Sequence, residues 1–166
     1  SVQFGKYQIL EELGRGGFGT VYKAQDKVLG RLVAIKILHG ALIIEPSFLE
    51  RFRQEARTAA MLDHPNLVPV HDFSETEGRY FIAMGYMPGG SLKDLIKREG
   101  KLVPKRALAL LEQVGAGLSY AHSQGVIHRD LKPGNILFDG KGQARVSDLG
   151  FARVMNVGSS QSLSVS

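Results

Sequence analysis

Apolar and polar positions alternate along the first part of the chain and recur at helical spacing in the second part. Three short segments rich in Val, Ile, Tyr and Leu, separated by glycine-containing turns, predict an antiparallel meander at residues 7–13, 19–26 and 32–38. Two more strands are predicted at residues 67–73 and 79–84, around a polar turn. The pattern predicts a five-stranded antiparallel sheet.

Apolar residues three and four positions apart predict helices. Ser47 stands three residues before Glu50, which is the spacing of a capping box, and apolar residues follow at helical intervals. The sheet is therefore predicted to carry one helix. Further along, Ser91 with Asp94 predicts the cap of a short helix that runs through Lys97.

A long helix is predicted over residues 104–122. Its apolar stripe consists of Leu108, Leu111, Val114, Leu118 and Ala121. The helix also contains Gly115 and Gly117, which either weaken it or allow another segment to pack closely against it.

These elements predict an α+β fold with two parts. A Pro- and Gly-containing linker at the start of residues 87–155 separates this mostly helical part from residues 1–86, which contain the predicted sheet and one helix. Residues 156–166 are rich in Gly, Ser, Asn and Gln, which is typical of a disordered tail. Small strands beside loops are predicted at residues 126–127, 136–138 and 144–146.

The composition is that of a globular protein and narrows the choice of partners. Of the 166 residues, 43% are hydrophobic and 22% are charged, with a formal net charge of +5. The basic residues are interspersed with acidic ones, so no nucleic-acid partner is expected. Cysteine is absent, which excludes disulfides and thiolate metal sites. No apolar run approaches the roughly 18 residues of a membrane span, and the default location is the cytoplasm.

Gly14, Gly16 and Gly19 form a G-x-G-x-x-G pattern between two apolar segments. Dinucleotide-binding proteins use this spacing where a strand turns into a helix, but residues 20–24 are strand-like in pattern. A glycine hairpin has another use, because its backbone N–H groups can lie close to phosphates when no side chain intervenes. A turn that binds no ligand is the third interpretation.

A lysine, Lys36, stands inside the apolar strand Val-Ala-Ile-Lys. Lysine is almost never fully buried without a partner, and Glu55 on the predicted helix is a candidate that would orient the ammonium group toward phosphates. Alternatively, the side chain extends from an edge strand into the solvent.

A polar loop with Asp130, Lys132 and Asn135 lies between two apolar runs, and a second carboxylate, Asp148, follows 18 residues after Asp130. Phosphoryl transfer requires a carboxylate that orients a hydroxyl, a cation and oxygen ligands for a metal ion. The loop therefore predicts a phosphoryl-transfer site.

Together, these motifs resemble the protein-kinase family and follow its order along the chain. The matching positions are residues 14–21, 33–36, Glu55, 128–135 and 148–150. The segments Met-Pro-Gly-Gly-Ser-Leu and Asp-Leu-Lys-Pro-Gly-Asn are similar to those of bacterial serine/threonine kinases. The resemblance implies a protein-kinase-like fold with two lobes. Residues 1–86 would be the nucleotide-binding lobe, and residues 87–155 would be part of the mostly helical second lobe with the catalytic and metal-binding loops.

The resemblance also implies roles for the polar residues. Lys36 would bind the α- and β-phosphates of ATP and be held by Glu55. Asp130 would accept the proton of the substrate hydroxyl or orient it, and Asn135 and Asp148 would bind Mg2+ through oxygen atoms.

An adenine site is implied as well. Met84 would lie behind the base as the gatekeeper, and the Gly85 carbonyl and the Met87 N–H would hydrogen-bond to the base. Gly85 replaces a residue that is often glutamate in the family, but this contact uses the main chain. The expected apolar contacts of the base are Leu13, Val21, Ala34 and Leu137, with Gly14, Gly16 and Gly19 over the phosphates.

Three positions refine what the resemblance implies. Lys132 occupies a place where serine/threonine kinases carry lysine, so the expected acceptor is a Ser or Thr hydroxyl of a protein. Leu149 stands where Phe is more usual, and a modest shift in the active-inactive balance is expected. Arg129 would bind a phosphate on the following segment, whose acceptors are Ser159, Ser160, Ser162 and Ser164.

The sequence ends at Ser166, before the Ala-Pro-Glu motif and the later helices of the family. The apolar stripe of the long helix is then expected to lack partners, which predicts self-association through this surface or poor stability. Three hypotheses follow: an ATP-dependent serine/threonine protein kinase, a truncated kinase-like ATP-binding or interaction module with little or no phosphotransfer, and a dinucleotide-dependent oxidoreductase.

Overall fold

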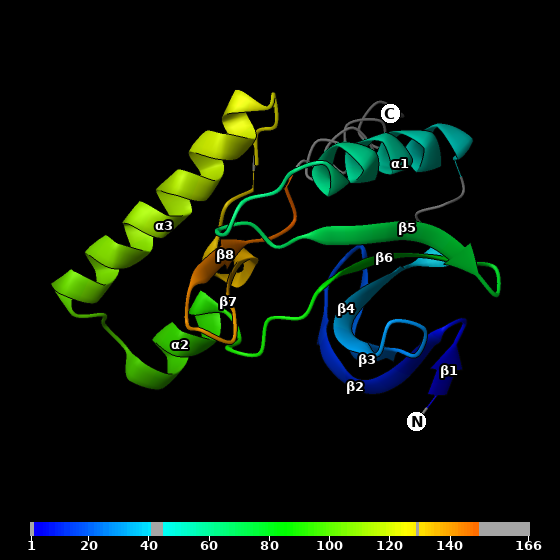
Figure 1. The fold of residues 1–166 in the computed structure, drawn as a ribbon, viewed down its shortest axis with the longest axis horizontal. Coiled ribbons are helices and arrows are strands. Elements are labelled where there is room, and N and C mark those ends of the chain that lie inside the picture. The colour runs from blue at the N-terminus through cyan, green and yellow to red at the C-terminus, as the bar shows by residue number, and fades with distance from the viewer. Residues whose placement is uncertain (1, 41–44, 129, 150–166) are drawn as a thin grey trace, which may run out of the picture. The chain divides into compact units, whose positions relative to one another are not determined.

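Two structural units make up the chain in the computed structural model, which describes residues 2–40, 45–128 and 130–149. The first unit is Ser1–Ala60 with Val70–Tyr86, and the second is Met61–Pro69 with Met87–Ser166. The elements of each unit are labelled in Figure 1. The segment Met61–Pro69 is grouped with the second unit, whereas the sequence-based division placed it in the first.

The first unit contains a six-stranded antiparallel sheet with the strand order β1-β2-β3-β4-β6-β5. Its strands are β1 (Val2–Phe4), β2 (Tyr7–Arg15), β3 (Gly19–Asp26), β4 (Arg31–Leu38), β5 (Val70–Thr76) and β6 (Arg79–Gly85). Because side chains alternate between the two faces of the strands, one set of them lies in a shared apolar core. The buried members of this core are Phe4, Tyr7, Ala24, Val33, Ile35, Ile37, Phe81 and Ala83.

The prediction of five strands was wrong by one, because β1 was missed. This strand pairs with β2 across a tight turn in which Gly5 has a φ of 57°. Three residues show too little alternation for a periodic pattern to be recognised. The Phe4 side chain is nevertheless part of the core, and its ring meets Phe81 edge to face with centroids 5.3 Å apart.

The strand predicted at residues 67–73 is shifted along the chain. β5 begins at Val70, while Leu67 and Val68 are buried in the second unit. Pro69 separates the two, and a proline has no N–H with which to continue a ladder. The apolar run that predicted a single strand therefore serves both units.

Helix α1 (Pro46–Ala60) packs along β5 (Figure 1). Its Phe52 ring lies 5.6 Å from the ring of Phe73 on β5. The helix begins at Pro46, a position that proline favours because its missing N–H needs no partner there. Ser47 is therefore inside the helix, and the predicted capping box with Glu50 was wrong.

The described residues of the second unit form two α-helices, a 3-10 turn and a two-stranded hairpin. These elements are α2 (Leu92–Glu99), α3 (Pro104–Ser123), η2 (Pro133–Asn135), β7 (Ile136–Phe138) and β8 (Ala144–Val146). The predicted cap of α2 is confirmed, because Ser91 Oγ accepts the Asp94 N–H at 3.1 Å and the Asp94 carboxylate accepts the Ser91 N–H at 3.2 Å. The helix continues two residues beyond Lys97, to Glu99.

No strand forms at residues 126–127, although one was predicted. The Val126 N–H donates to the Ala121 carbonyl at 2.9 Å, so the segment closes the end of α3 instead. None of the described helices is long and apolar enough to cross a membrane.

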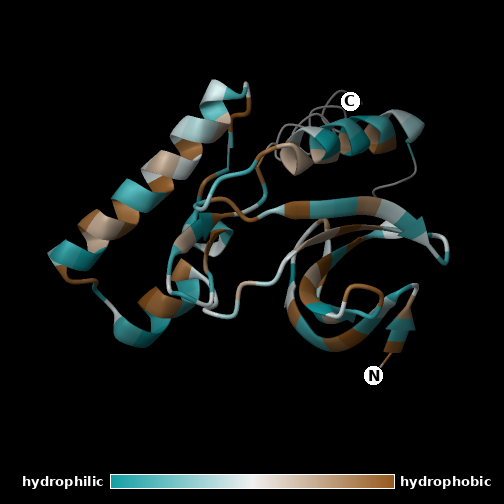
Figure 2. Cartoon of the chain, viewed as in Figure 1, coloured by the Kyte–Doolittle hydropathy of each residue, from teal (hydrophilic) through white to brown (hydrophobic). Residues whose placement is uncertain are grey.

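The apolar stripe of α3 is only partly buried. Val114 and Ala121 lie in the core of the second unit, whereas Leu108 and Leu111 are 60% and 68% exposed. Apolar positions of α3 are brown in Figure 2. The end of the helix that carries Leu108 and Leu111 therefore presents apolar surface.

Strand β8 pairs with β7 on one edge and with residues 66–68 on the other. The Val146 N–H donates to the Asn66 carbonyl at 2.8 Å, and the Val68 N–H donates to the Val146 carbonyl at 2.9 Å. Asn66 Nδ2 also donates to the Ala144 carbonyl at 2.9 Å. Residues 66–68 thus act as a third, parallel strand beside the hairpin.

One helix glycine is needed for this arrangement. A Cβ atom on Gly117 would lie 2.7 Å from the carbonyl oxygen of Asn66, whereas a Cβ on Gly115 would meet no atom within 4 Å. Of the two roles considered for these glycines, close packing holds for Gly117, while Gly115 only weakens the helix.

The two glycines are expected to respond oppositely to substitution. Gly117→Ala would push α3 away from Asn66 and lower the free energy of unfolding by about 1–3 kcal/mol. Gly115→Ala, the matched control, would raise it by up to about 1 kcal/mol through helix propensity. Urea unfolding measures both, and a Gly117→Ala variant as stable as Gly115→Ala would refute the close-packing explanation.

Candidate active site

The glycine hairpin joins β2 to β3. Gly14 is in register with Val21, and the Gly16 N–H donates to the Gly19 carbonyl at 3.0 Å. A Cβ on Gly14 or Gly16 would meet no atom within 4 Å, whereas a Cβ on Gly19 would fall on the carbonyl oxygen of Ile37. A strand follows the hairpin directly, so the helix N-terminus that a dinucleotide site requires is not at this position. The oxidoreductase hypothesis was therefore wrong.

Four of the residues predicted to bind nucleotide share one face of the sheet. Val21 pairs with Lys36 and Ala34 pairs with Met84, while Ala34 and Lys36 are two positions apart on β4. Residues that are paired across antiparallel strands point to the same side, as do alternate residues of one strand. Leu13 lies beside this group at an irregularity of β2 and is 45% exposed.

Lys36 is half-buried. Its strand, β4, is an interior strand of the sheet because it lies between β3 and β6. The alternative of a lysine on an edge strand was therefore wrong. Glu55 is half-buried on α1. An ion pair between Lys36 and Glu55 stays a prediction.

The remaining residues of the predicted base site are divided between the units. Gly85 ends β6 in the first unit, whereas Met87 and Leu137 belong to the second. All three are half-buried. Leu137 lies on β7 and forms an isolated bridge with Ser91 at the start of α2.

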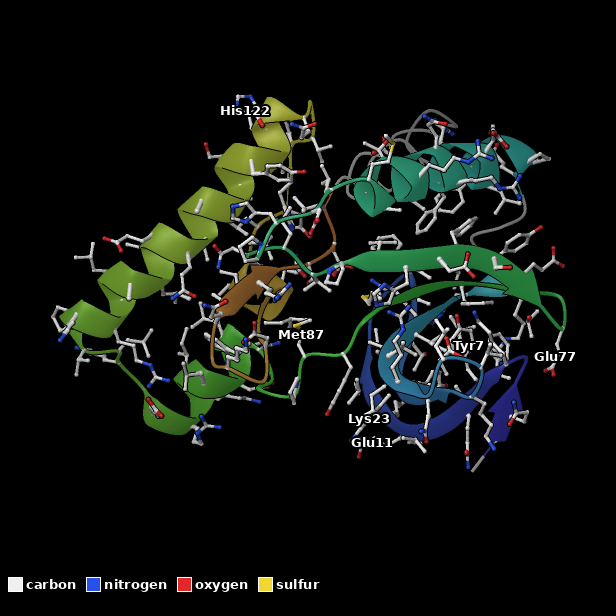
Figure 3. All side chains as sticks on the ribbon, in the orientation of Figure 1. Tyr7, Glu11, Lys23, Glu77, Met87 and His122 are labelled. Atoms are coloured by element: carbon white, nitrogen blue, oxygen red, sulfur yellow. The ribbon has the colours of Figure 1, made fainter. Side chains whose placement is uncertain are left out.

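Sequence reasoning missed a charged group close to these positions. Lys23, two residues after Val21 on β3, forms an ion pair of 3.9 Å with Glu11 on β2 (Figure 3). Its Nζ atom also lies 4.9 Å from the centre of the Tyr86 ring, which follows Gly85. Neither contact has a local sequence signal.

Four residues of the second unit form a closed hydrogen-bond ring: His128, Asp130, Asn135 and Ser147. The Asp130 N–H donates to His128 Nδ1 at 3.1 Å, and Asn135 Nδ2 donates to the Asp130 carbonyl at 2.8 Å. The Ser147 N–H donates to the Asn135 carbonyl at 2.8 Å, and the Ser147 carbonyl lies 2.7 Å from His128 Nε2. Because Asp148 follows Ser147, the ring connects three residues that were predicted to act on ATP or substrate.

The hydrogen-bond ring determines the tautomer of His128, which is 5% exposed. A backbone N–H can only donate, so Nδ1 must accept from Asp130 and the proton must be on Nε2, which donates to Ser147. The imidazole is neutral in this arrangement and orients the backbone on both sides of the site.

The carboxylate of Asp130 is accessible. Lys132 Nζ lies 3.3 Å from Asp130 Oδ2, and the two side chains are 60% and 58% exposed. An ion pair this exposed contributes little to stability. Both side chains are therefore accessible from the solvent.

Asn135 and Asp148 offer the oxygen atoms that Mg2+ prefers. The hydrogen bond from Asn135 Nδ2 to Asp130 uses the amide nitrogen, so the amide oxygen remains the atom suited to a cation. Asp148 is half-buried and has a φ of 60°. No group of three acidic, His or Cys residues that could hold a metal ion is found within the described ranges.

Leu149, at the position where Phe is more usual, is 5% exposed and packs in the core of the second unit. Its side chain therefore anchors the residue next to Asp148. Arg129 and the serines at positions 159, 160, 162 and 164 lie outside the described residues, as do residues 150–166 generally.

The β7–β8 hairpin carries Asn135 at its start and Asp148 beyond its end. Across its turn, Arg145 Nε donates to Asp139 Oδ2 at 3.1 Å, and Arg145 Nη1 donates to the Leu67 carbonyl at 3.1 Å. Burial alone would raise the pKa of Asp139. Three donors outweigh this effect of burial and hold the pKa of Asp139 below its ordinary value: the Gln143 N–H, the Arg145 guanidinium and the Lys141 N–H.

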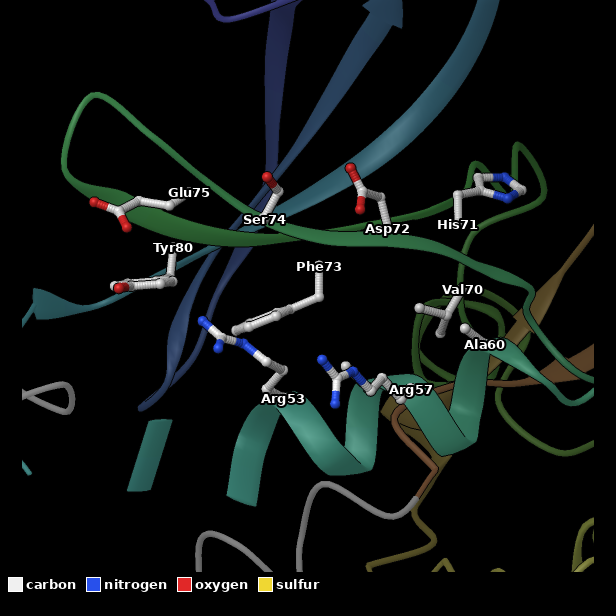
Figure 4. A pocket seen from close by; sticks show the side chains of 11 residues that line it. Arg53, Arg57, Ala60, Val70, His71, Asp72, Phe73, Ser74, Glu75 and Tyr80 are labelled. Atoms are coloured by element: carbon white, nitrogen blue, oxygen red, sulfur yellow. The ribbon is translucent and has the colours of Figure 1, made fainter. Parts of the chain in front are cut away.

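A separate pocket of about 440 Å3 lies between α1 and β5 in the first unit (Figure 4). It contains none of the residues predicted to bind nucleotide. Arg53 and Arg57 on α1 and Asp72 and Glu75 on β5 are among the residues that line it.

Comparison with known proteins identifies the family. The protein kinase domain matches residues 7–166. The chain is 44% identical over 152 residues to the serine/threonine-protein kinase PrkC of Bacillus subtilis and 43% identical over 157 residues to the serine/threonine-protein kinase PknA of Mycobacterium tuberculosis, covering 92% of this chain in each case. It also resembles the crystal structure of the Mycobacterium tuberculosis PknI kinase domain, with a TM-score of 0.76 and 33% identity over 90% of this chain. The chain belongs to the protein kinase family.

The chain spans 24% of the length of PrkC, 36% of PknA and 61% of the PknI kinase-domain structure. The relatives confirm the resemblance to bacterial serine/threonine kinases and the α+β kinase-like fold.

Replacing Asp139 is expected to lower the stability of the protein at neutral pH and to remove the contribution of this carboxylate to the pH dependence of stability. Because its pKa is lowered in the folded state, the ionised group stabilises the protein above the ordinary aspartate pKa of about 4, and this contribution is lost as the pH falls through the lower folded value. Asp139→Asn should therefore unfold at a lower temperature than the wild type at pH 7, and the difference should narrow below about pH 4. A gap that stayed constant from neutral to acidic pH would contradict this assignment.

Proposed function

We propose that this chain is the nucleotide-binding and catalytic part of an ATP- and Mg2+-dependent protein kinase that phosphorylates Ser or Thr hydroxyls of proteins. The observation that carries the proposal is the hydrogen-bond ring, which joins Asp130, Asn135 and the residue before Asp148 in one network. Relatives covering most of this chain are named serine/threonine-protein kinases.

In this proposal the first unit binds the nucleotide. The backbone of the glycine hairpin, open at Gly14 and Gly16, lies over the phosphates, and Lys36 binds two of them while Glu55 holds the lysine. Ala34, Val21 and the other predicted contacts surround the base. The face shared by Val21, Ala34, Lys36 and Met84 supports this assignment.

The second unit orients the acceptor hydroxyl and binds the metal. Asp130 is exposed and accepts a hydrogen bond from the hydroxyl, which aligns the attacking oxygen. Lys132, 3.3 Å away, neutralises charge that develops on the transferred group. Mg2+, when bound to Asn135 and Asp148, would neutralise the phosphate oxygens. The cytoplasm, where ATP and Mg2+ are available, is the proposed location.

Removing the Asp130 carboxylate tests this function against the alternative of an ATP-binding module without phosphotransfer. Asp130→Asn is expected to reduce transfer of labelled phosphate from ATP to a generic protein substrate by about 10²–10⁴-fold. Nucleotide should still raise the melting temperature of the variant, because the base and phosphate contacts are elsewhere. If wild type and variant transfer equally little while both bind nucleotide, the module is the better description.

We also propose that copies of this chain associate through the exposed end of α3. Leu108 and Leu111 lie three residues apart on one helical face and are mostly exposed. Exposed contiguous apolar surface of this kind favours association.

Charges on this face are expected to prevent association. The Leu108→Glu/Leu111→Glu variant should sediment as a smaller species than the wild type at equal concentration, since a carboxylate is poorly tolerated in an apolar contact. Lys105→Glu, on the exposed first turn of α3, is the matched control. A wild type that is already monomeric over the concentration range would contradict the proposal.

A further inference from the structure

Ser147 makes more hydrogen bonds within the ring than its backbone position requires. Its side chain is buried at 6% exposure, and Ser147 Oγ donates to the Asn135 carbonyl at 3.2 Å. The Ser147 N–H donates to the same oxygen at 2.8 Å. A carbonyl oxygen accepts two hydrogen bonds, and here one residue supplies both.

These two hydrogen bonds from one residue to the same carbonyl oxygen restrain the chain immediately before Asp148. The Ser147 N–H on Asn135 and the Ser147 carbonyl on His128 Nε2 already hold the backbone. The hydroxyl is a second donor to the Asn135 oxygen and further opposes rotation of Ser147 about that oxygen. Asp148 has a φ of 60°, a left-handed conformation that costs a non-glycine residue free energy and persists only where its surroundings enforce it. The Ser147 hydroxyl is placed to help enforce it.

Loss of this hydroxyl would leave no unpaired buried group. The Asn135 carbonyl would still accept the hydrogen bond from the Ser147 N–H, and the hydroxyl that donates the second hydrogen bond would no longer be present. The expected cost to global stability is therefore small, because the large penalties come from buried polar groups that lose their only partner. The effect should appear in the separation of Asn135 and Asp148 rather than in folding.

We propose that Ser147 is a positioning residue that sets the spacing of the two Mg2+-binding side chains, Asn135 and Asp148. This inference rests on the proposed function, and it assigns a role to a serine that carries none of the predicted chemistry. Ser147 does not contact the reacting atoms and acts through its neighbours on either side.

The test measures binding and not turnover. The affinity of a fluorescent, non-hydrolysable ATP analogue is titrated over a range of Mg2+ concentrations for the wild type and Ser147→Ala. The variant should need about fivefold more Mg2+ to reach half of the Mg2+-dependent gain in affinity, which corresponds to one hydrogen bond. Its affinity for the nucleotide without Mg2+ and its melting temperature should be unchanged.

Two further variants sharpen the test. Ser147→Thr retains the hydroxyl and should retain the wild-type Mg2+ dependence. Ser123→Ala is the matched control, because Ser123 Oγ also donates to a backbone carbonyl, that of Tyr120 at 2.6 Å, at the end of α3. It should leave the Mg2+ titration unchanged.

An Mg2+ titration of Ser147→Ala that coincides with that of the wild type overturns the inference and leaves the proposed function intact. Equal loss of affinity with and without Mg2+, together with a lower melting temperature, also overturns it, since that outcome indicates a structural role. A wild-type protein that binds no nucleotide at any Mg2+ concentration overturns the proposed function and the inference together.

Discussion

Strand β8 must have a hydrogen-bond partner on each edge, and the positions of the candidate active-site residues in the second unit depend on this constraint. Ala144 and Val146 are 1% and 0% exposed, so their backbone groups cannot be satisfied by water. Val146 uses Asn66 and Val68 on one edge, and the Ala144 N–H is met by Gln113 Oε1 of α3 at 2.6 Å. A strand of three residues has little stability of its own, so these long-range partners determine where Ser147 and Asp148 lie.

The hydrogen-bond ring positions the charged residue Asp130 through its backbone, and the carboxylate takes no part in the ring. Its donors and acceptors are backbone groups, a neutral imidazole, an amide and a hydroxyl. If the carboxylate of Asp130 served as the structural acceptor, it would be desolvated and less available to a substrate. With the carboxylate outside the ring, Asp130 stays exposed and its backbone alone supports the site. Buried charges are costly, which explains why the buried hydrogen-bonding groups of the ring are neutral while the charged carboxylate of Asp130 is exposed.

The sequence allowed prediction of elements whose signals are local. Alternation predicted five of the six strands, and the Ser91–Asp94 spacing predicted a helix cap that forms as expected. Local signals failed where a segment is short or is shared between the units, as for β1 and for the residues before Pro69. In the same way, motif spacing indicated Asp130, Asn135 and Asp148. It did not indicate Asn66, which is 78 residues from its partner Ala144, because periodicity contains no information about such distant contacts.

The glycine pattern illustrates why a motif predicts chemistry better than it predicts packing. Gly14, Gly16 and Gly19 look equivalent in the sequence, but a side chain would have open space at the first two and would strike Ile37 at the third. The first two glycines leave the backbone of the hairpin uncovered by side chains, and an uncovered backbone turn can form a binding site for phosphates. The third lets β3 approach β4 closely at the base of the hairpin, two positions before the pairing of Val21 with Lys36. A hairpin that binds phosphates must be open at its tip and fixed at its base, and the same residue type meets these two requirements for different physical reasons.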